Sequence, residues 1–575
     1  MGLASEQTAL LDNMAPSLHS PPVKSYDAGI VDGNGYGAFS GFAAKEAPAS
    51  IDWQDKVPSE RRKRVIIVGA GICGIQQASV LLRDGDIKIE DMVIFDALGD
   101  FGGVWEKNKY PGCACDVPAM VYTTSYHINT EYSHYFAERQ EIQSYYAQFA
   151  KSYNLQACTR FESLVKSCSW DEDLMVWHVG VEDKQSGTMQ HWVSDTVIQC
   201  IGSLDRPKWG NTPGRENYKG VSWHTAHWRH DYDLTGKNVA IIGCGPSAAQ
   251  IIPQIVDKVS HLTVYMRTPP VCVPRNDYKH SKLFRWAMRY IPLFPFLIRL
   301  RLNLEMMIWG KQTATEGAKL NTNLTLAANH FMESQIQDPV LREKLRPNSK
   351  FFCKRPLFLD TFYSALAKPN CTVLKEKLIR YTPNGVISEE QGVSQEQERA
   401  FDVIIFGTGF NVSQFLEHEK ITGIGGVDLQ VKWKEHPEAL YGLATNGFPN
   451  MFMCFGPNSA HVWSSQQDTW ERQARFNCKM IREIHQSERK GLKLAVHPNR
   501  QVERDYNLTL QQEQIGKFVW MNPTCITYYK NDAGWNTYTM PWSWWQFRNM
   551  LRKIQWNQWE RVEKPLGKED SFPEI

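Results

Sequence analysis

The sequence predicts an α/β protein with two Rossmann-like dinucleotide-binding domains, because a glycine-rich turn follows a short apolar run at two places. Residues 69–74 (GAGICG) follow the apolar run 64–68, and residues 243–248 (GCGPSA) follow the apolar run 239–242. Glycines in such turns let the backbone approach a pyrophosphate, whose charge the N-terminus of the next helix stabilises. Two turns of this kind indicate electron transfer between two bound nucleotides.

The composition is that of a globular protein large enough for two or three domains. The chain has 575 residues, of which 42% are hydrophobic and 22% charged. Its 64 Lys and Arg nearly balance its 62 Asp and Glu, so it lacks the charge footprint of a nucleic-acid-binding protein. Thirteen cysteines without paired spacing, and an N-terminus without a secretory signal, lead us to expect a reduced, intracellular and cytoplasmic protein.

The segment around the first turn contains every part of a dinucleotide cradle. Its glycines are Gly69, Gly71 and Gly74, and a helix is expected directly after them. A strand over residues 92–95 ends at Asp96, about 20 residues after the turn, where an acid can hydrogen-bond a ribose hydroxyl. An ordinary glycine-rich turn is the alternative, and the strand, helix and terminal acid together argue against it.

The segment around the second turn predicts a preference for NADPH. Ala248 takes the third small position and still permits close helix–strand packing. The next strand, over residues 262–266, ends at Arg267 instead of an acid, and a guanidinium can bind a 2′-phosphate that a carboxylate would repel. A solvated charge at a strand end is the alternative for Arg267. The contacts expected at this nucleotide are Gly243, Gly245, Ser247, Arg267 and Thr268.

Residues 102–105 (GGVW) and 110–116 (YPGCACD) form a further motif, followed by Tyr122. By composition this is a loop with a flat aromatic and a carboxylate, and the simplest role for Asp116 is to cap a helix or turn. The motif resembles the flavin-contacting segment of the class B flavin monooxygenases, and most of all that of the Baeyer–Villiger monooxygenases. The resemblance implies that Asp116 lies near the isoalloxazine ring, and it adds Gly103, Trp105 and Tyr122 as cofactor contacts.

Residues 218–228 (YKGVSWHTAHW) resemble the Baeyer–Villiger fingerprint F-x-G-x-x-x-H-x-x-x-W, which Pro or Asp follows. Tyr218 stands in place of Phe and Arg229 in place of Pro or Asp, which suggests a divergent subgroup. Trp228 favours this group over the sister enzymes that oxidise amines and sulfides, since those usually carry Tyr there. For His224 we favour a hydrogen-bonded residue of the interdomain hinge over an acid–base catalyst, because the sequence shows no partner for catalysis.

Residues 352–360 (FCKRPLFLD) resemble the K-R-P motif of the same family. The resemblance implies that Arg355 lies at the flavin edge and that Lys354 binds the NADPH phosphate, whereas an isolated basic pair would simply end a strand. We expect Arg355 and Asp116 to be the catalytic residues, because a guanidinium stays protonated at any working pH and the carboxylate can orient it. Residues 455–459 resemble the closing flavin segment and add Asn458 as a cofactor contact.

Residues from about 278 to 350 follow a helical period and are strongly apolar over 283–309. Pro292 and Pro295 interrupt this stretch and it contains several arginines, so a membrane-spanning helix is not expected. A helix on the membrane surface is one interpretation. A helical insert packed beside the substrate pocket is the one that we favour.

The resemblance implies the domain order of the whole chain. The FAD-binding domain is expected over residues 61–205 and again over 396–575, where it ends in a pocket segment. The NADPH-binding domain is expected over 206–395, inserted between these parts and carrying the helical insert. Residues 1–60 are expected to be a loosely ordered extension.

The resemblance also implies the reaction, in which one oxygen atom from O2 is inserted beside a ketone carbonyl to give an ester or lactone. FAD and NADPH would be the cofactors, with no metal and no nucleic acid. The divergent fingerprint and the long N-terminal extension resemble the fungal secondary-metabolite branch. Two alternatives stay open: an N- or S-oxygenating or hydroxylating monooxygenase, and a non-oxygenating flavin reductase. The reductase would need a redox C-x-x-C, for which Cys113-x-Cys115 is the only close pair.

Overall fold

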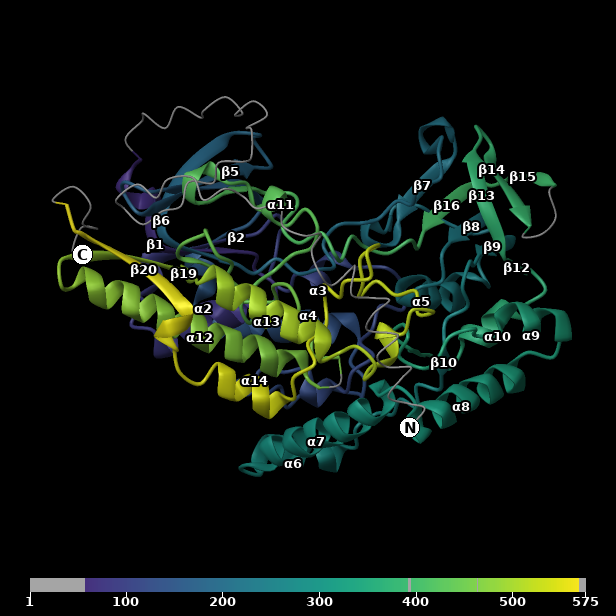
Figure 1. Ribbon diagram of the computed structural model, residues 1–575. Coiled ribbons are helices and arrows are strands. Elements are labelled where there is room, and N and C mark those ends of the chain that lie inside the picture. The colour runs from purple at the N-terminus through teal and green to yellow at the C-terminus, as the bar shows by residue number, and fades with distance from the viewer. Residues whose placement is uncertain (1–56, 391–394, 463, 568–575) are drawn as a thin grey trace, which may run out of the picture.

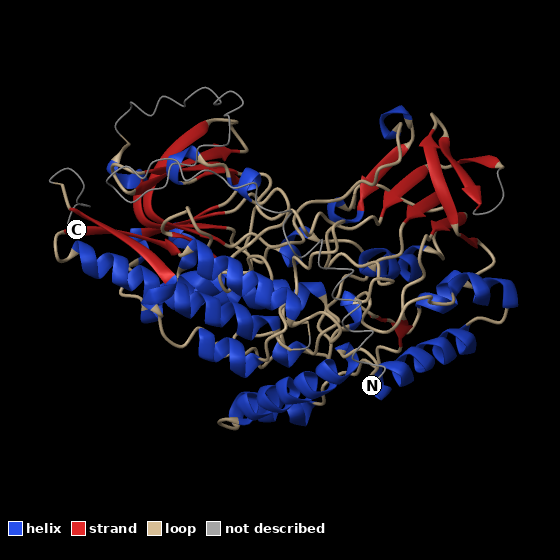
Figure 2. Ribbon diagram, viewed as in Figure 1, coloured by secondary structure: helices blue, strands red, loops and turns tan. Residues whose placement is uncertain are grey.

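The computed structural model of the protein describes residues 57–390, 395–462 and 464–567. Almost all of the expected N-terminal extension, residues 1–56, therefore lies outside the described residues. Two sheets lie on opposite sides of the view in Figure 1, loops run between them, and most of the helices lie below (Figure 2). This arrangement is an α/β fold with two Rossmann-like sheets, which confirms the fold class predicted from the glycine turns.

The first sheet is centred on β1 (Arg62–Val68), which pairs in parallel with β2 and β6. Residues 65–68 of β1 are buried, as expected for a parallel strand covered on both faces. The order of the sheet is β17-β4-β5-β6-β1-β2-β3, with β18 also beside β6. These strands are β2 (Met92–Phe95), β3 (Thr159–Arg160), β4 (Ser163–Asp171), β5 (Val176–Asp183), β6 (Met189–Gln199), β17 (Lys420–Thr422) and β18 (Met451–Met453).

The second sheet is parallel throughout and has the order β12-β9-β8-β16-β7. Its strands are β7 (Val221–His224), β8 (Asn238–Ile242), β9 (His261–Tyr265), β12 (Cys371–Leu374) and β16 (Val403–Phe406). An antiparallel sheet adjoins it in sequence, made of β13 (Glu376–Tyr381), β14 (Gly385–Glu390) and β15 (Glu396–Ala400). Two strand pairs complete the described strands: β10 (Cys272–Val273) with β11 (Leu357–Phe358), and β19 (Leu492–Pro498) with β20 (Trp559–Pro565).

The chain leaves the first sheet after β6 and returns to it at β17, so the second sheet is inserted in the first. The expected boundary at residues 395/396 is wrong, because β15 still pairs with β14, and β16 pairs with β7 and β8. The apolar run 403–406 therefore lies inside the second sheet, between β8 and β7, and the return crossing follows it.

Helices α2 (Ile72–Asp84) and α5 (Pro246–Ile255) each begin directly after a glycine turn. The helical insert consists of α6 (Lys282–Tyr290), α7 (Phe294–Ala314), α8 (Lys319–Gln335) and α9 (Pro339–Leu345). The remaining α-helices are α3 (Val104–Lys107), α4 (Arg139–Ser152), α10 (Phe362–Leu366), α11 (Leu429–Lys432), α12 (Gln466–Glu488), α13 (Arg500–Gln512) and α14 (Trp544–Met550). Within the described residues, none of the helices combines the length and the apolar character needed to cross a bilayer.

Candidate active site

The two glycine turns face one cavity of about 2530 Å³. Gly69 and Gly71 line it from the first sheet, and Gly243 and Gly245 line it from the second. Pockets for a single small ligand measure about 300–1,000 Å³. This cavity therefore has room for two dinucleotides and a small substrate together.

At the first turn, the backbone requires glycine at Gly69 and Gly74, and the neighbouring loop requires it at Gly103, whereas a Cβ on Gly71 would lie 3.4 Å from the Cα of Gly103. Gly69 has a φ of +105°, and a Cβ there would lie 2.8 Å from the carbonyl oxygen of Cys200. A Cβ on Gly103 would lie 2.8 Å from the Cα of Gly71, so the two glycine loops touch at their backbones. A Cβ on Gly74 would lie 1.8 Å from the Gly69 oxygen, so only glycine at this position lets α2 pack closely against the end of β1.

Asp96 lies at the end of β2 and lines the cavity, as its position in the sequence predicts. One carboxylate oxygen accepts a hydrogen bond from Ala70 N at 2.6 Å, and the other accepts one from Leu98 N at 2.8 Å. Burial raises the pKa of Asp96 to about 6, although the two hydrogen bonds act in the opposite direction and lower it. The acid thus fixes the turn itself, and its remaining lone pairs are left for a ribose hydroxyl.

The second turn leaves open space where a pyrophosphate would bind. Gly243 has a φ of +100°, and a Cβ there would lie 2.4 Å from the oxygen of Gly407, which follows β16. A Cβ on Gly245 would meet no atom within 4 Å, so protein packing does not explain this glycine. Gly245 is the N-cap of α5, and Ser247 in its first turn also lines the cavity. The residues present fit a dinucleotide phosphate at this helix end.

Arg267 and Lys354 both line the cavity, together with Thr268. Burial, with a further contribution from the charge of Arg267, lowers the pKa of Lys354. Two cations that lie near enough to influence each other can together bind an anionic group such as a 2′-phosphate. The structure thus brings together the two basic residues that the sequence assigned to NADPH.

The loop over residues 102–122 links the two sheets. Trp105 Nε1 donates a hydrogen bond to the hydroxyl of Tyr122 at 3.0 Å, and both residues line the cavity. The Tyr110 hydroxyl donates to Gln250 Oε1 on α5 at 3.0 Å, and Gln250 Nε2 donates to Ala114 O at 2.9 Å. The loop is therefore fastened to the helix that follows the second turn.

Arg355 and Asp116 form a two-pronged ion pair in this cavity. Arg355 Nε donates to one carboxylate oxygen at 2.8 Å, and Arg355 Nη2 donates to the other at 2.7 Å. The charge of Asp116 raises the pKa of Arg355 well above its ordinary value. The Arg355 side chain is 46% exposed, and it lines the cavity, so its remaining donors can reach a ligand. Residues 239 positions apart in the sequence thus form one pair in this cavity.

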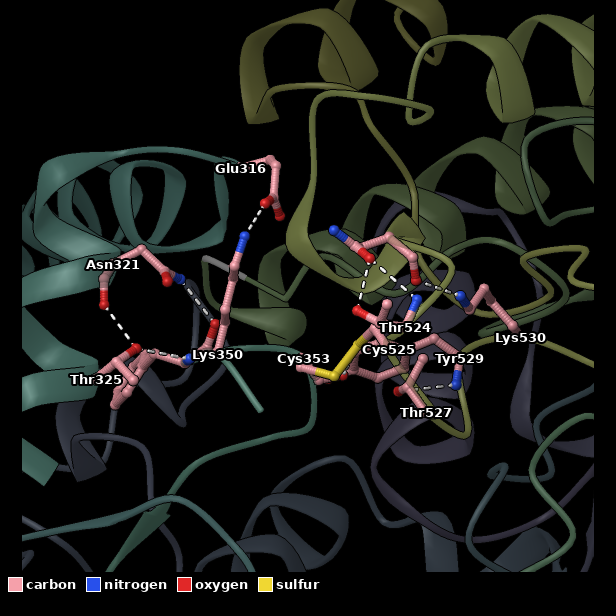
Figure 3. Close-up of a disulfide and its surroundings, with 12 residues drawn as sticks. Glu316, Asn321, Thr325, Lys350, Cys353, Thr524, Cys525, Thr527, Tyr529 and Lys530 are labelled. Carbon is pink, nitrogen blue, oxygen red and sulfur yellow. Dashed lines mark hydrogen bonds and ion pairs between the residues drawn. A yellow bond between two sulfur atoms is a disulfide. The ribbon is translucent and has the colours of Figure 1, made fainter. Parts of the chain in front are cut away.

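Cys353 and Cys525 form a disulfide between segments 172 residues apart (Figure 3). The expectation of reduced cysteines is wrong for this pair, whose partners meet only in the fold, and the other eleven are free. The next residue after each cysteine, Lys354 or Ile526, lines the cavity. The bond therefore ties the K-R-P segment to the C-terminal pocket segment.

Three tyrosines of the C-terminal segment lie around Arg355. Tyr528 and Tyr529 lie near enough to Arg355 to raise its pKa further, and Tyr528 and Tyr538 line the cavity. The rings of Tyr528 and Tyr529 lie 4.6 Å apart, and those of Tyr529 and Tyr538 are stacked at 5.5 Å. Sequence reasoning missed Tyr529 and Tyr538, although the aromatic density of this segment was a signal for them.

The structure bears on two further predictions, for the hinge and for the closing segment. His224 is fully buried, accepts a hydrogen bond from Ala226 N at 3.1 Å, and packs against Phe410 after β16. Burial lowers the pKa of His224 to about 4, so it is neutral at pH 7 and suits the hinge role. Asn458 is buried and donates to the main-chain oxygens of Asn536 and Thr539, so its side chain positions the C-terminal segment, and its contact with a cofactor stays a prediction.

Glu419 is a buried acid in the cavity wall that sequence reasoning missed. It accepts a hydrogen bond from Gln199 Nε2 at 2.6 Å, and burial raises its pKa to about 8. It directly precedes β17, and no motif marks it. Its position depends on the return of the chain to the first sheet, which the sequence does not specify.

A flavin-binding monooxygenase-like family model matches residues 62–568. The chain belongs to this family. A Baeyer–Villiger monooxygenase of Pseudomonas aeruginosa is 34% identical to it over 521 residues, covering 90% of this chain and 95% of that protein. FAD-binding monooxygenase BOA2 of Botryotinia fuckeliana is 32% identical over 524 residues, covering 90% and 97%. The resemblance seen in the motifs is confirmed.

Solved structures share the fold of this family member. The complex of OTEMO with FAD and NADP aligns with a TM-score of 0.76 at 21% identity, covering 87% of this chain and 99% of that one. Closed cyclohexanone monooxygenase aligns with a TM-score of 0.75 at 21% identity, covering 88% and 100%.

Proposed function

We propose that the chain is an FAD- and NADPH-dependent Baeyer–Villiger monooxygenase, which inserts one oxygen atom from O2 beside a ketone carbonyl to give an ester or lactone. The observation that carries the proposal is the Arg355–Asp116 pair, which lies in the same cavity as both glycine turns. The 34% identity with a Baeyer–Villiger monooxygenase over 90% of the chain supports it.

The described residues provide separate places for the two cofactors. The turn at Gly69 and Gly71, with Asp96, would hold FAD, and the turn at Gly243 and Gly245 would hold NADPH. Arg267 and Lys354 would bind its 2′-phosphate. When bound, NADPH supplies hydride and FAD supplies the oxygen activation that the reaction needs.

Arg355 provides a fixed positive charge for oxygen atoms that become negative as the ester forms. Its guanidinium keeps its proton at any working pH, and the charge of Asp116 raises its pKa further. A cation placed where negative charge develops, without reorganisation, lowers the barrier. Asp116 is a positioning partner, because two hydrogen bonds leave the guanidinium little freedom to rotate.

The aromatic wall around this pair would exclude water from the reacting atoms. Trp105 and Tyr122 form one side, and Tyr528 and Tyr538 form another. Burial raises the pKa of each of these tyrosines well above the ordinary range, so all three stay neutral at working pH. Next to the Arg355–Asp116 pair the cavity wall is thus made of uncharged aromatic side chains, which suits a neutral ketone.

We infer the class of ketone substrate from the relatives. Fungal FAD-binding monooxygenases are among the relatives, for example BOA2 and ktnD. We infer a ketone on a secondary-metabolite skeleton as substrate. The flavin reductase alternative is disfavoured because burial raises the pKa of Cys113 to about 11 and that of Cys115 to about 12, which leaves both as unreactive thiols.

The test is product analysis with NADPH, O2 and matched panels of ketones, amines and thioethers. We expect a one-oxygen gain with ketones, giving products that alkali hydrolyses to an acid and an alcohol. Oxygen gain with the amines or thioethers alone would assign the chain to the N- or S-oxygenating group. NADPH oxidation with neither oxygenated product nor hydrogen peroxide would indicate a reductase.

A further inference from the structure

The exposed face of α7 is apolar, which reverses the usual pattern of a surface helix. Leu297, Leu300, Leu304 and Ile308 recur at helical spacing, and Leu293 precedes them at the N-cap. These five side chains are between 44% and 72% exposed. They form a continuous apolar stripe along the helix, because positions three or four apart lie on the same face.

The opposite face of α7 packs Ile298 and Leu302 against the core and also carries two buried polar residues, Arg299 and Asn303, which fix the orientation of the helix. Arg299 is buried and forms an ion pair with Asp468 of α12. It also donates to the carbonyl oxygen of Thr123 at 3.2 Å. Asn303, one turn later, is buried as well and donates to Arg299 O at 3.1 Å. Turning the apolar stripe inward would leave the buried Asp468 without its cation, at a cost that burial of a few leucines would not offset.

Helix α6 continues the apolar surface. Leu283, Trp286 and Tyr290 lie on one face at spacings of three and four, and they are 73%, 52% and 61% exposed. The inner side of the helix carries the buried Ala287 and Met288. Figure 1 shows α6 and α7 next to each other along the lower edge of the molecule, outside both sheets. We call this combined surface, from Leu283 to Trp309, the α6–α7 face.

The α6–α7 face is also strongly basic. Residues 282–314 contain six basic residues and one acid, on a chain whose formal net charge is only +2. With the buried Arg299 set aside, five are exposed, namely Lys282, Arg285, Arg289, Arg301 and Lys311. Two acids lie near them: Glu305 accepts from Arg301 at 2.7 Å, and Glu131 lies 3.9 Å from Arg289.

We propose that the α6–α7 face docks the protein in the plane of an anionic lipid bilayer. Leucines and isoleucine would enter the acyl boundary, Trp286, Tyr290 and Trp309 would lie at the headgroup level, and the basic residues would contact anionic lipid phosphates. A second copy of this chain is a poorer partner, because pairing the face with itself brings like charges together. The two proline-broken helices suit lying on a bilayer and not crossing it.

Docking there would place the cavity close to the bilayer. Met306 of α7 lines the cavity, so one helix contributes to both the cavity wall and the exposed face. An apolar ketone dissolved in the membrane could then enter without crossing water. This consequence rests on the proposed function, whereas docking itself does not.

The test is flotation of the full-length, FAD-loaded protein with vesicles of phosphatidylcholine alone or with phosphatidylserine added. We expect flotation with the anionic vesicles and little with the neutral ones, and weaker flotation as salt is raised. The double variant Arg285→Gln/Arg289→Gln should partition on the order of tenfold or more weakly at physiological salt. The double variant Leu297→Gln/Trp309→Gln should lose flotation with both vesicles.

The matched control is Met189→Gln/Val340→Gln, which changes two side chains that are 56% and 64% exposed on other elements. It should float like the wild type. Bound FAD and the unfolding temperature confirm that each variant is folded. Equal flotation of the wild type and both α6–α7 variants would overturn the proposal. Absence of flotation of the wild type with the anionic vesicles would overturn it too. If a dimer that Leu297→Gln/Trp309→Gln dissociates accompanied that result, the occupant of the face would be a second copy of the chain.

Discussion

Replacing Arg355 with alanine should abolish ester formation while the protein still folds, binds FAD and oxidises NADPH. The two hydrogen bonds of 2.8 and 2.7 Å to Asp116 disappear together with the positive charge. Asp116 remains, so the local charge changes from about neutral to negative at the place where the reaction itself develops negative charge. The substitution therefore removes a stabilising charge and adds a repulsive one.

The expected loss is on the order of 10²–10³ in the rate of oxygen insertion, which is typical of removing one preorganised donor. The residual Asp116 charge adds to this loss, but the Asp116 side chain is 26% exposed, so solvent partly screens the repulsion. Electrons from NADPH should then appear as hydrogen peroxide. Arg355→Lys keeps the charge but loses the two-pronged geometry, so it should lie between alanine and the wild type.

The assay measures ester or lactone and hydrogen peroxide per NADPH consumed. Asp116→Ala should shift the ratio in the same direction, more mildly, because it removes only the positioning partner. Arg561→Ala removes a surface arginine of similar exposure that pairs with Glu563 at 2.7 Å, and it should leave the ratio unchanged. A near wild-type product yield from Arg355→Ala would refute the assignment of the oxygenating charge to this residue.

Three further outcomes are expected. Arg267→Ala should raise the KM for NADPH by about tenfold or more, because a charge-assisted pair is worth about 1.5–3 kcal/mol. The KM for NADH should change little. Equal losses for the two cofactors would show that Arg267 does not contact the 2′-phosphate. Burial raises the pKa of Glu419 from 4.5 to about 8, so its protonated form stabilises the fold at low pH and this contribution is lost as the pH rises through that window. In denaturant titrations, Glu419→Gln should therefore be more stable than the wild type at pH 8.5 by at most about 5 kcal/mol, but not at pH 4.5. The exposed Glu417→Gln should show no such trend. Cys525→Ser should lose about 2–4 kcal/mol of unfolding free energy, and reductant should remove this difference from the wild type. A loss that persists in reductant would contradict the cross-link. So would an equal loss in Cys371→Ser, which replaces a free thiol.

The sequence predicts the parts of this fold that depend on local chemistry. The glycine turns, the strands before them and Asp96 lie where their spacing puts them, because turn geometry and helix position are set within a few residues. The boundary near residue 395 could not be predicted as well. The run 403–406 has the same apolar character in either sheet, and only pairing with β7 and β8 decides which sheet it joins.

Contacts between distant segments account for the rest. The Cys353–Cys525 bond joins residues 172 positions apart, and neither spacing nor composition identifies the partner of either cysteine. Asn458 lies within a recognisable motif, yet its amide nitrogen donates hydrogen bonds to the main-chain oxygens of residues 536 and 539. The apolar stretch 283–309 was ambiguous because periodicity does not say which face is buried, and the ion pair of Arg299 with Asp468 determines it.

The most direct test of the central claim is mass spectrometry of the product formed from a ketone with NADPH under ¹⁸O2. The account predicts an ester or lactone that carries one ¹⁸O atom in the new C–O–C linkage for each NADPH consumed in coupled turnover. A product labelled on nitrogen, on sulfur or as a new hydroxyl group would contradict it. So would NADPH consumption that gives only hydrogen peroxide with every ketone tested.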